Sequence, residues 1–368
     1  MPQRLQRAFS RDAGTMSGGV PVFDVHAHNF LRAEIDQCGA AGPEYGLDDE
    51  GVPFFRAGQM TMRNFHMFNG PQGSYTARLE LMDELDVTAQ LVISHAVTFF
   101  YREPIADAVH YNRVRNDAIA EFVAQSPRLF GAATLPLQSP DEAVKELHRA
   151  TQELGLVATY LGATAGDRLL SDPAYEELWE EHARLGIPAM IHGNRGGGID
   201  SPALPAREQH NLEVVLGYPI DEGMAVAHLL LGGVLERHPG LRIVSYHGGG
   251  MIPYQKGRLQ HAFETQRAKN PTPTMRPFAE LWSQVFFDTA LHGRDSLEFL
   301  LRVQDPRNVV IGTNFGGWDQ EAGLLDELAA LGLSDDTIAD VSYRNAARLF
   351  GILPEEIEML HGGQTVAV

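Results

Sequence analysis

Val22-Phe23-Asp24-Val25-His26-Ala27-His28 is the stretch that decides the fold. An apolar run ends here in two histidines at positions i and i+2, and in a strand such residues point to the same face. Short apolar runs of this kind are typical of a strand buried in a parallel sheet. The stretch predicts a first strand, Val22–His26, whose end directs two imidazoles towards one point.

From this strand onward, short apolar runs alternate with longer amphipathic runs, which is the pattern of repeated βα units. The count reaches eight and predicts an α/β fold, a (β/α)₈ TIM barrel. The chain has 368 residues, 44% of them hydrophobic, enough for one large core and a single domain. The expected strands are Val22–His26, Gln90–Ser94, Phe130–Thr134, Leu156–Tyr160, Ala189–His192, Arg242–His247, Val285–Asp288 and Val309–Thr313.

Amphipathic stretches between the strands predict the outer helices. Two of them carry helix-start signals, Ser139-Pro140 and Ser171-Asp172-Pro173, which place a cap and a proline at the first turn. Further helices are expected after the eighth strand, including Ser334–Asp340 and Tyr343–Phe350. The helices expected within the barrel are Thr76–Asp86, His110–Gln125, Asp141–Leu154, Ala174–Leu185, Asp221–Arg237, Pro253–Gln266 and Ser296–Val303.

The boundaries of the barrel follow from composition. Residues 1–20 lack an apolar run long enough for a secretion signal and are expected to form an N-terminal arm; the barrel spans 21–360, and 361–368 form a polar tail. The longest irregular stretch, Asn29–Ser74, follows the first strand and is expected to be a lid loop over the barrel mouth. A second long loop, Gly193–Glu213, follows the fifth strand.

Charge and cysteine content limit the partners and the compartment. The net charge of −19 gives no reason to expect nucleic acid or an anionic membrane as partner. No stretch after the arm approaches the length of a membrane span. The single cysteine, Cys38, excludes an intramolecular disulfide, so we expect a reducing cytoplasm.

Two further strands also end in histidine, the fifth at His192 and the sixth at His247. With His26 and His28 this makes four histidines at the carboxyl ends of three strands, the rim where barrel active sites are built. If these histidines had only a structural role, their occurrence at the ends of three separate strands would be three unrelated coincidences. Three imidazoles with an open position suit zinc, or manganese and iron when oxygen ligands complete the sphere, and a fourth imidazole can handle a proton.

The order of these motifs resembles the amidohydrolase superfamily, and within it the branch of aminocarboxymuconate semialdehyde decarboxylase. The likeness runs from Phe23 to Phe350 and includes His-x-His, a later His-Gly, and Gly-Thr at the eighth strand. Other matching stretches are Leu135-Pro136-Leu137-Gln138, Leu216-Gly217-Tyr218-Pro219, Gly233-Val234-Leu235-Glu236-Arg237 and His247-Gly248-Gly249-Gly250.

This resemblance implies metal ligation by His26, His28 and His192, and proton handling by His247. The branch has an aspartate after Gly-Thr, whereas this chain has Asn314, which we expect at the metal and among the catalytic residues. A carboxamide can offer its oxygen but cannot act as acid or base. Either the asparagine is a natural variant, or an Asp-to-Asn change was introduced to hold substrate uncleaved. If a proton shuttle is required there, Asn314→Asp should raise turnover.

A carboxylate substrate calls for a guanidinium partner. Arg63 is the first candidate and Arg56 the second, both in the long first loop, although solvated loop arginines are the alternative. Arg258 follows the fourth histidine by eleven residues, where the branch has an arginine that reaches a neighbouring subunit; this implies a homodimer. Arg195 and Trp318 are expected to shape the pocket.

The function that the resemblance implies is non-oxidative decarboxylation of an aromatic or conjugated unsaturated carboxylic acid. The expected cofactor is a divalent metal, zinc first and manganese as the alternative. The first rival is a hydrolase of the same branch that opens an ester, lactone or amide, with a hydratase as a further possibility. A rival of another class is a weakened barrel that binds a small molecule or partner without turnover, for which Asn314 is the support.

Overall fold

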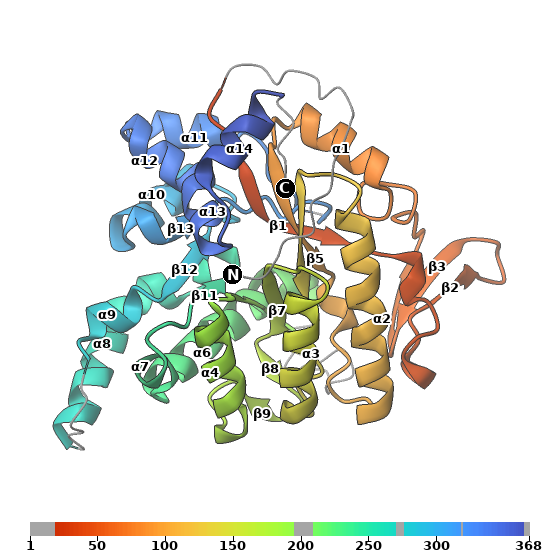
Figure 1. Ribbon diagram of the computed structural model, residues 1–368, viewed down its shortest axis with the longest axis horizontal. Helices are drawn as coiled ribbons and strands as arrows, with labels where there is room; N and C mark the ends of the chain where they lie inside the picture. Colours follow the sequence, from red (N-terminus) through yellow and green to blue (C-terminus); the bar gives the residue numbers. More distant parts are fainter. Residues whose placement is uncertain (1–18, 195–208, 270–275, 318, 364–368) are drawn as a thin grey trace.

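A computed structural model describes residues 19–194, 209–269, 276–317 and 319–363 (Figure 1). It confirms the barrel: eight parallel strands lie side by side in the order in which they follow along the chain. The strands are β1 (Phe23–Asn29), β5 (Ala89–Ser94), β6 (Leu129–Ala133), β7 (Ala158–Gly162), β10 (Ala189–His192), β11 (Ile243–Ser245), β12 (Val285–Asp288) and β13 (Val309–Val310).

Backbone hydrogen bonds between β1 and the segment after β13 close the barrel. Val25 donates to the carbonyl of Ile311 at 2.9 Å, and Phe315 donates to the carbonyl of His26 at 2.8 Å. The amide of His28 in turn donates to the carbonyl of Phe315 at 3.0 Å. The chain around Phe315 is therefore fixed in register beside the two histidines of β1.

The outer helices lie between the strands, close to the predicted ranges. The helix-start signals are confirmed: α3 begins at Pro140, and the side chain of Asp172 accepts from the amide of Ala174 at 2.9 Å ahead of α4. The single helix predicted over Asp221–Arg237 was wrong, because Gly233 adopts φ 76° and ends the run. The helices are α1 (Tyr75–Glu84), α2 (Ile105–Val123), α3 (Pro140–Gln152), α4 (Glu176–Leu185), α6 (Tyr218–Leu231), α7 (Val234–Arg237), α8 (Ile252–Lys269), α9 (Phe278–Trp282) and α10 (Arg294–Val303).

Extra helices follow the barrel at the C-terminal end, as expected, and Figure 1 shows them in blue beside β1 and β13. They are α11 (Leu324–Ala330), α12 (Asp335–Ala339), α13 (Asn345–Leu349) and α14 (Pro354–His361). The predicted tail boundary is corrected here, since His361 is the last residue of α14 and its Nδ1 lies 3.0 Å from the hydroxyl of Thr88. Residues 1–18 and 364–368 lie outside the described ranges.

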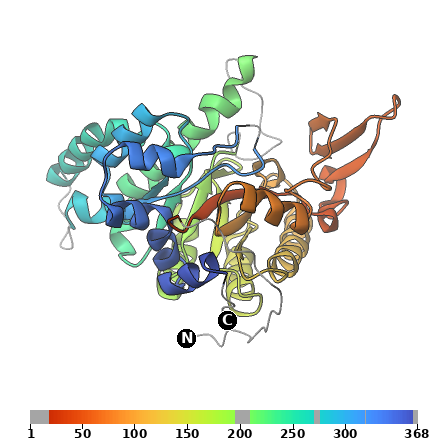
Figure 2. The same cartoon turned by 90° about the horizontal axis from the view of Figure 1, so that it is seen from above.

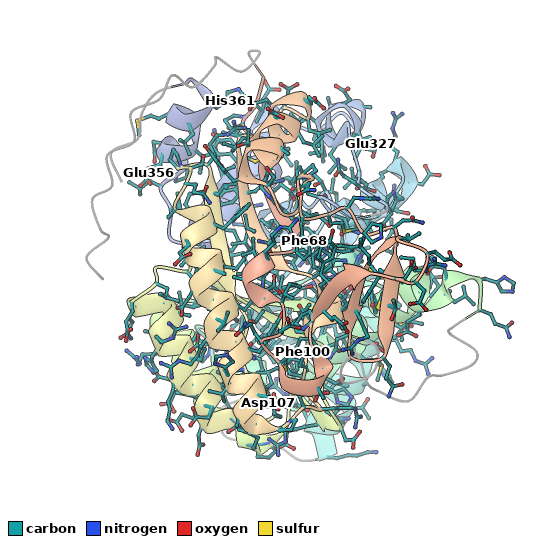
Figure 3. All side chains as sticks on the ribbon, turned by 90° about the vertical axis from the view of Figure 1, so that its right-hand side faces the viewer. Phe68, Phe100, Asp107, Glu327, Glu356 and His361 are labelled. Carbon is teal, nitrogen blue, oxygen red and sulfur yellow. The ribbon has the colours of Figure 1, made fainter. Side chains whose placement is uncertain are left out.

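The stretch after β1 is not the irregular loop that its composition suggested. It contains an antiparallel sheet of β2 (Glu44–Leu47), β3 (Pro53–Ala57) and β4 (Met60–Arg63), which Figure 2 shows extending away from the barrel. Strand β3 of this sheet packs on a small aromatic core. Figure 3 shows this side of the molecule. That core includes Phe68 and Phe100. Its aromatic side chains are therefore buried in packing.

The helical segment after β10 corrects the expectation that no stretch approaches the length of a membrane span. Residues Gln209–Leu231 are long and apolar enough to cross a membrane by length and composition. One side of the segment packs on the barrel, where Val226 and Leu229 are fully buried. Val215 and Leu216, near its N-terminal end, remain about half exposed. The segment is thus a barrel helix that leaves apolar side chains at the surface.

Candidate metal centre

Three histidines from two strands meet at the barrel mouth, as predicted. His26 and His28 come from the end of β1 and His192 from the end of β10, and all three are buried. One nitrogen of each ring lies within 4.8 Å of the others, and the Nε2 atoms of His26 and His28 are 3.2 Å apart. The β-strand alternation that places residues i and i+2 on one side explains this convergence.

The hydrogen bonds of the outer ring nitrogens decide which nitrogen carries a free electron pair. Nδ1 of His28 donates to the carbonyl of Ser94 at 2.9 Å, and Nδ1 of His192 donates to the carbonyl of Gly193 at 2.8 Å. Because a carbonyl can only accept, both Nδ1 atoms carry the proton. Their Nε2 atoms therefore present lone pairs to the centre, which is the arrangement of metal-binding histidines.

His26 is held by a carboxylate. Its Nδ1 lies 2.7 Å from Oδ2 of Asp288, at the end of β12, and the other oxygen of Asp288 accepts from the amide of Gly248 at 2.8 Å. Asp288 thus contacts both groups through its two oxygens. Burial raises the pKa of Asp288 to about 8. A divalent cation at the histidines favours its ionised form.

The geometry and the protonation states fit a divalent metal. Two nitrogens bound to one tetrahedral ion at about 2.0–2.1 Å lie roughly 3.3 Å apart, close to the observed separation. Burial lowers the pKa of His28 to about 4 and the pKa of His26 and His192 well below their usual value. All three imidazoles are therefore neutral at pH 7, the form in which histidine binds metals.

His247 lies beside this cluster and is held by a carboxylate that the sequence analysis missed. Its ring centroid is 5.1 Å from those of His26 and His192, and its Nδ1 lies 2.9 Å from Oε1 of Glu222 on α6. Burial opposes the charged form, but the charge and hydrogen bonds of Glu222, helped by Asp288, outweigh it and raise the pKa of His247 to about 9. Glu222 thus favours the protonated form of His247, in which Nε2 carries a proton.

Glu222, His247 and His192 form a second group close enough to hold a metal. Glu222 already accepts from His247 and, at 2.8 Å, from the amide of Gly193. These donors satisfy the carboxylate, whereas the electron pairs of the three strand-end histidines face one another. The cluster of His26, His28 and His192 is therefore the better metal site.

The glycines after His247 are required by the turn that carries it. His247 has φ 48°, and the three glycines that follow also have positive φ. A Cβ atom at Gly249 would lie 2.3 Å from the ring of Phe287, and one at Gly250 would lie 1.9 Å from the carbonyl of Pro219. Only glycine fits this tight turn, which sets the imidazole at the mouth.

Asn314 lies beside the same strands, with φ 52° and 7% of its surface exposed. Its Nδ2 donates to Oδ1 of Asp319 at 2.7 Å, while its Oδ1 is buried without a hydrogen-bond partner in the described part of the chain. The predicted metal ligation by Asn314 remains a prediction.

Two of the candidate substrate arginines, Arg56 and Arg63, lie in the sheet β2–β4 and form ion pairs there. Arg56 pairs with Glu44 at 2.9 Å, and Arg63 pairs with Asp48 at 2.7 Å in the projecting sheet, where its side chain is half exposed. Both guanidiniums thus pair with surface carboxylates, and the substrate role of each remains a prediction. Arg258 is exposed on α8.

Arg195 and Trp318 lie outside the described residues. Besides Glu222, the sequence analysis missed His95, which follows β5 and stacks on Phe30 with ring centroids 4.7 Å apart. Its ring centroid is 5.0 Å from that of His28. Its place directly after a strand end was the available signal; Glu222, on a helix, offered none.

Comparison with known proteins agrees with this geometry. A 2-amino-3-carboxymuconate-6-semialdehyde decarboxylase of Dictyostelium discoideum is 29% identical over 65% of this chain and 65% of its own length, so the match leaves about a third of that relative uncovered. A gamma-resorcylate decarboxylase of Rhodococcus jostii is 27% identical over 74% of this chain and 86% of its own.

A solved structure shares the fold. The dihydroxybenzoic acid decarboxylase of Polaromonas sp. JS666, with bound manganese and the inhibitor 2-nitroresorcinol, superposes with a TM-score of 0.67, covering 90% of this chain and 97% of that one at 19% identity. The sequence pattern of the family described as Amidohydrolase matches residues 23–352, nearly all of the barrel. The chain therefore belongs to the amidohydrolase family, as its strand-end histidines predicted.

Proposed function

We propose that this protein is a metal-dependent, non-oxidative decarboxylase of an aromatic or conjugated unsaturated carboxylic acid. The observation that carries the proposal is the imidazole of His247, held by Glu222 at 2.9 Å, beside the three convergent histidines. Decarboxylation without an oxidant needs a proton donor and a positive charge near the departing carboxylate. The two decarboxylase relatives and the decarboxylase of like fold support the same reaction class.

The residues divide the reaction between them. A proton from Nε2 of His247 adds to the carbon that bears the carboxylate, through an electron pair of the conjugated π system; the bond to the carboxylate then breaks, its electron pair restores the π system, and carbon dioxide leaves. Glu222 holds Nδ1 of His247 and so directs Nε2. His26, His28 and His192 would hold the metal, which supplies Lewis-acid charge to orient the oxygens of the substrate.

Zinc and manganese both suit this donor set. Three imidazoles alone favour zinc, and we keep it as the first expectation. The manganese in the Polaromonas decarboxylase supports the alternative.

We further propose a small carboxylate as substrate, a homodimer and a cytoplasmic location; the single cysteine supports the last of these.

The reaction class is tested by supplying metal-loaded protein with carboxylic acids and with esters, amides and lactones. We expect carbon dioxide from hydroxybenzoates or conjugated unsaturated acids, without acid release from the other compounds. His247→Gln should lower the rate by about 10²–10⁴-fold, typical for loss of a positioned proton donor, while metal content stays the same. Acid release from a lactone or ester, without carbon dioxide from any acid, would assign a hydrolase instead.

A further inference from the structure

The amide of Asn314 is oriented by its neighbour. Asp319 offers acceptor oxygens, so the amide nitrogen must be the atom that faces it, at 2.7 Å. The amide oxygen is then the atom left over, and it is buried without a partner among the described residues. A buried acceptor without a donor is costly unless a ligand or ion satisfies it.

The backbone holds Asn314 beside the strand that carries two of the metal-binding histidines. The residue before Asn314 is tied to β1, because the hydroxyl and amide of Thr313 donate to the two oxygens of Asp24 at 2.7 and 3.0 Å. The residue after it, Phe315, forms a bridge with Ala27, the residue between the two metal-binding histidines of β1. Asn314 is therefore clamped on both sides beside that strand.

Asp319 is close enough for its charge to reach the same centre. Its Oδ1 accepts from Nδ2 of Asn314 at 2.7 Å, and Asn314 directly precedes Phe315, the residue that bridges to β1 between the two histidines. Its side chain is 16% exposed, and Oδ2 lies 3.4 Å from Nε2 of His292. The carboxylate is thus partly shielded from water, where a charge acts over a longer distance.

We propose that Asn314 and Asp319 together replace a single carboxylate at the metal centre. Asn314 offers its amide oxygen to the centre, and Asp319, five residues further along, supplies the negative charge and holds the amide by its nitrogen. Asp319, which acts through Asn314, is a positioning residue in this arrangement. The inference rests on the metal centre of the proposed function but not on the reaction that occurs there.

This pairing changes what is expected of Asn314→Asp. The sequence alone suggested a gain in turnover, because a carboxylate seemed to be missing. With Asp319 at 2.7 Å from the amide, that substitution sets two carboxylates against each other and removes the donor that holds Asp319. The informative variants are therefore the loss of the charge, Asp319→Asn, and its exchange, Asn314→Asp with Asp319→Asn.

The test is a titration of chelator-stripped protein with manganese(II) ion alone, which needs no substrate. We expect Asp319→Asn to weaken manganese binding by about 10–100-fold, as loss of a partner of a metal ligand does. The exchange variant keeps one carboxylate and one amide and should return the affinity to within about threefold of the unaltered protein. Asp336→Asn, which removes one charge from a 91% exposed side chain, is the control and should change nothing.

An affinity of Asp319→Asn within twofold of the unaltered protein would overturn the proposal. So would an exchange variant as weak as Asp319→Asn. Thermal unfolding of the metal-free variants checks that each one folds; if Asp319→Asn does not fold, the exchange variant measured against Asp336→Asn decides. Because carbon dioxide release is not measured, failure here is distinct from failure of the proposed decarboxylation.

Discussion

At the scale of single residues, the metal site depends on which ring nitrogen of each histidine is protonated. Backbone carbonyls settle this for His28 and His192, and Asp288 settles it for His26. The sequence predicted the three ligands because strand periodicity is local. It could not predict Glu222, since the partner of His247 lies on a helix and its approach depends on barrel closure.

Asp288→Asn tests the protonation argument. Asp288 accepts through one oxygen from His26 and through the other from the amide of Gly248, whereas asparagine has an acceptor at only one of these two positions. If the amide nitrogen faces His26, the imidazole must carry its proton on Nε2 and can no longer bind the metal. We expect the dissociation constant for manganese to rise by about 10–100-fold. Unchanged binding, measured by calorimetry, would show that Asp288 does not orient the ligand.

At the scale of elements, the strands and the outer helices were predictable, and the segment after β1 was not. Apolar runs identified all eight strands because each is buried on both faces. The sheet β2–β4 was missed because its strands are largely half-exposed and are separated by turns of only a few residues. The ion pair of Arg63 could not be predicted for the same reason, since its partner Asp48 lies in the turn between two of these strands.

His182 on α4 gives a prediction about helix packing. It is buried, its Nδ1 bonds to the carbonyl of Leu178, and its Nε2 lies 2.9 Å from the hydroxyl of Thr159 on β7. Burial lowers its pKa from 6.5 to about 4. The folded state therefore binds this proton less readily than the unfolded state, so its contribution to stability is present above pH 6.5 and lost as the pH falls towards 4.

The free energy of unfolding is expected to fall by roughly 3 kcal/mol over that interval, because each unit of pKa difference corresponds to about 1.4 kcal/mol. His182→Gln keeps a polar group for Thr159 but cannot titrate, so its free energy of unfolding should fall less on acidification than that of the unaltered protein. Denaturant unfolding at pH 7 and at pH 4.5 measures the difference. Parallel loss in both proteins would rule out His182 as its source.

At the scale of the whole molecule, exposed apolar side chains support a homodimer. Leu216 on the segment before α6 is 52% exposed and Tyr254 on α8 is 75% exposed, and α6 and α8 pack together. We expect light scattering to find a dimer at micromolar concentration, and Leu216→Asp or Tyr254→Asp to shift it towards monomer. Leu353→Asp, on a 62% exposed leucine before α14, is the matched control. A monomer in the unaltered protein would end this proposal.

The central claim is that one divalent metal, held by His26, His28 and His192, is required for decarboxylation. The most direct test adds zinc or manganese stepwise to chelator-stripped protein and measures carbon dioxide release, with bound metal determined by elemental analysis. We predict that the rate rises linearly and levels off at about one metal per chain, and that His192→Ala neither retains metal nor releases carbon dioxide. Full activity with less than about a tenth of an equivalent of metal would contradict it.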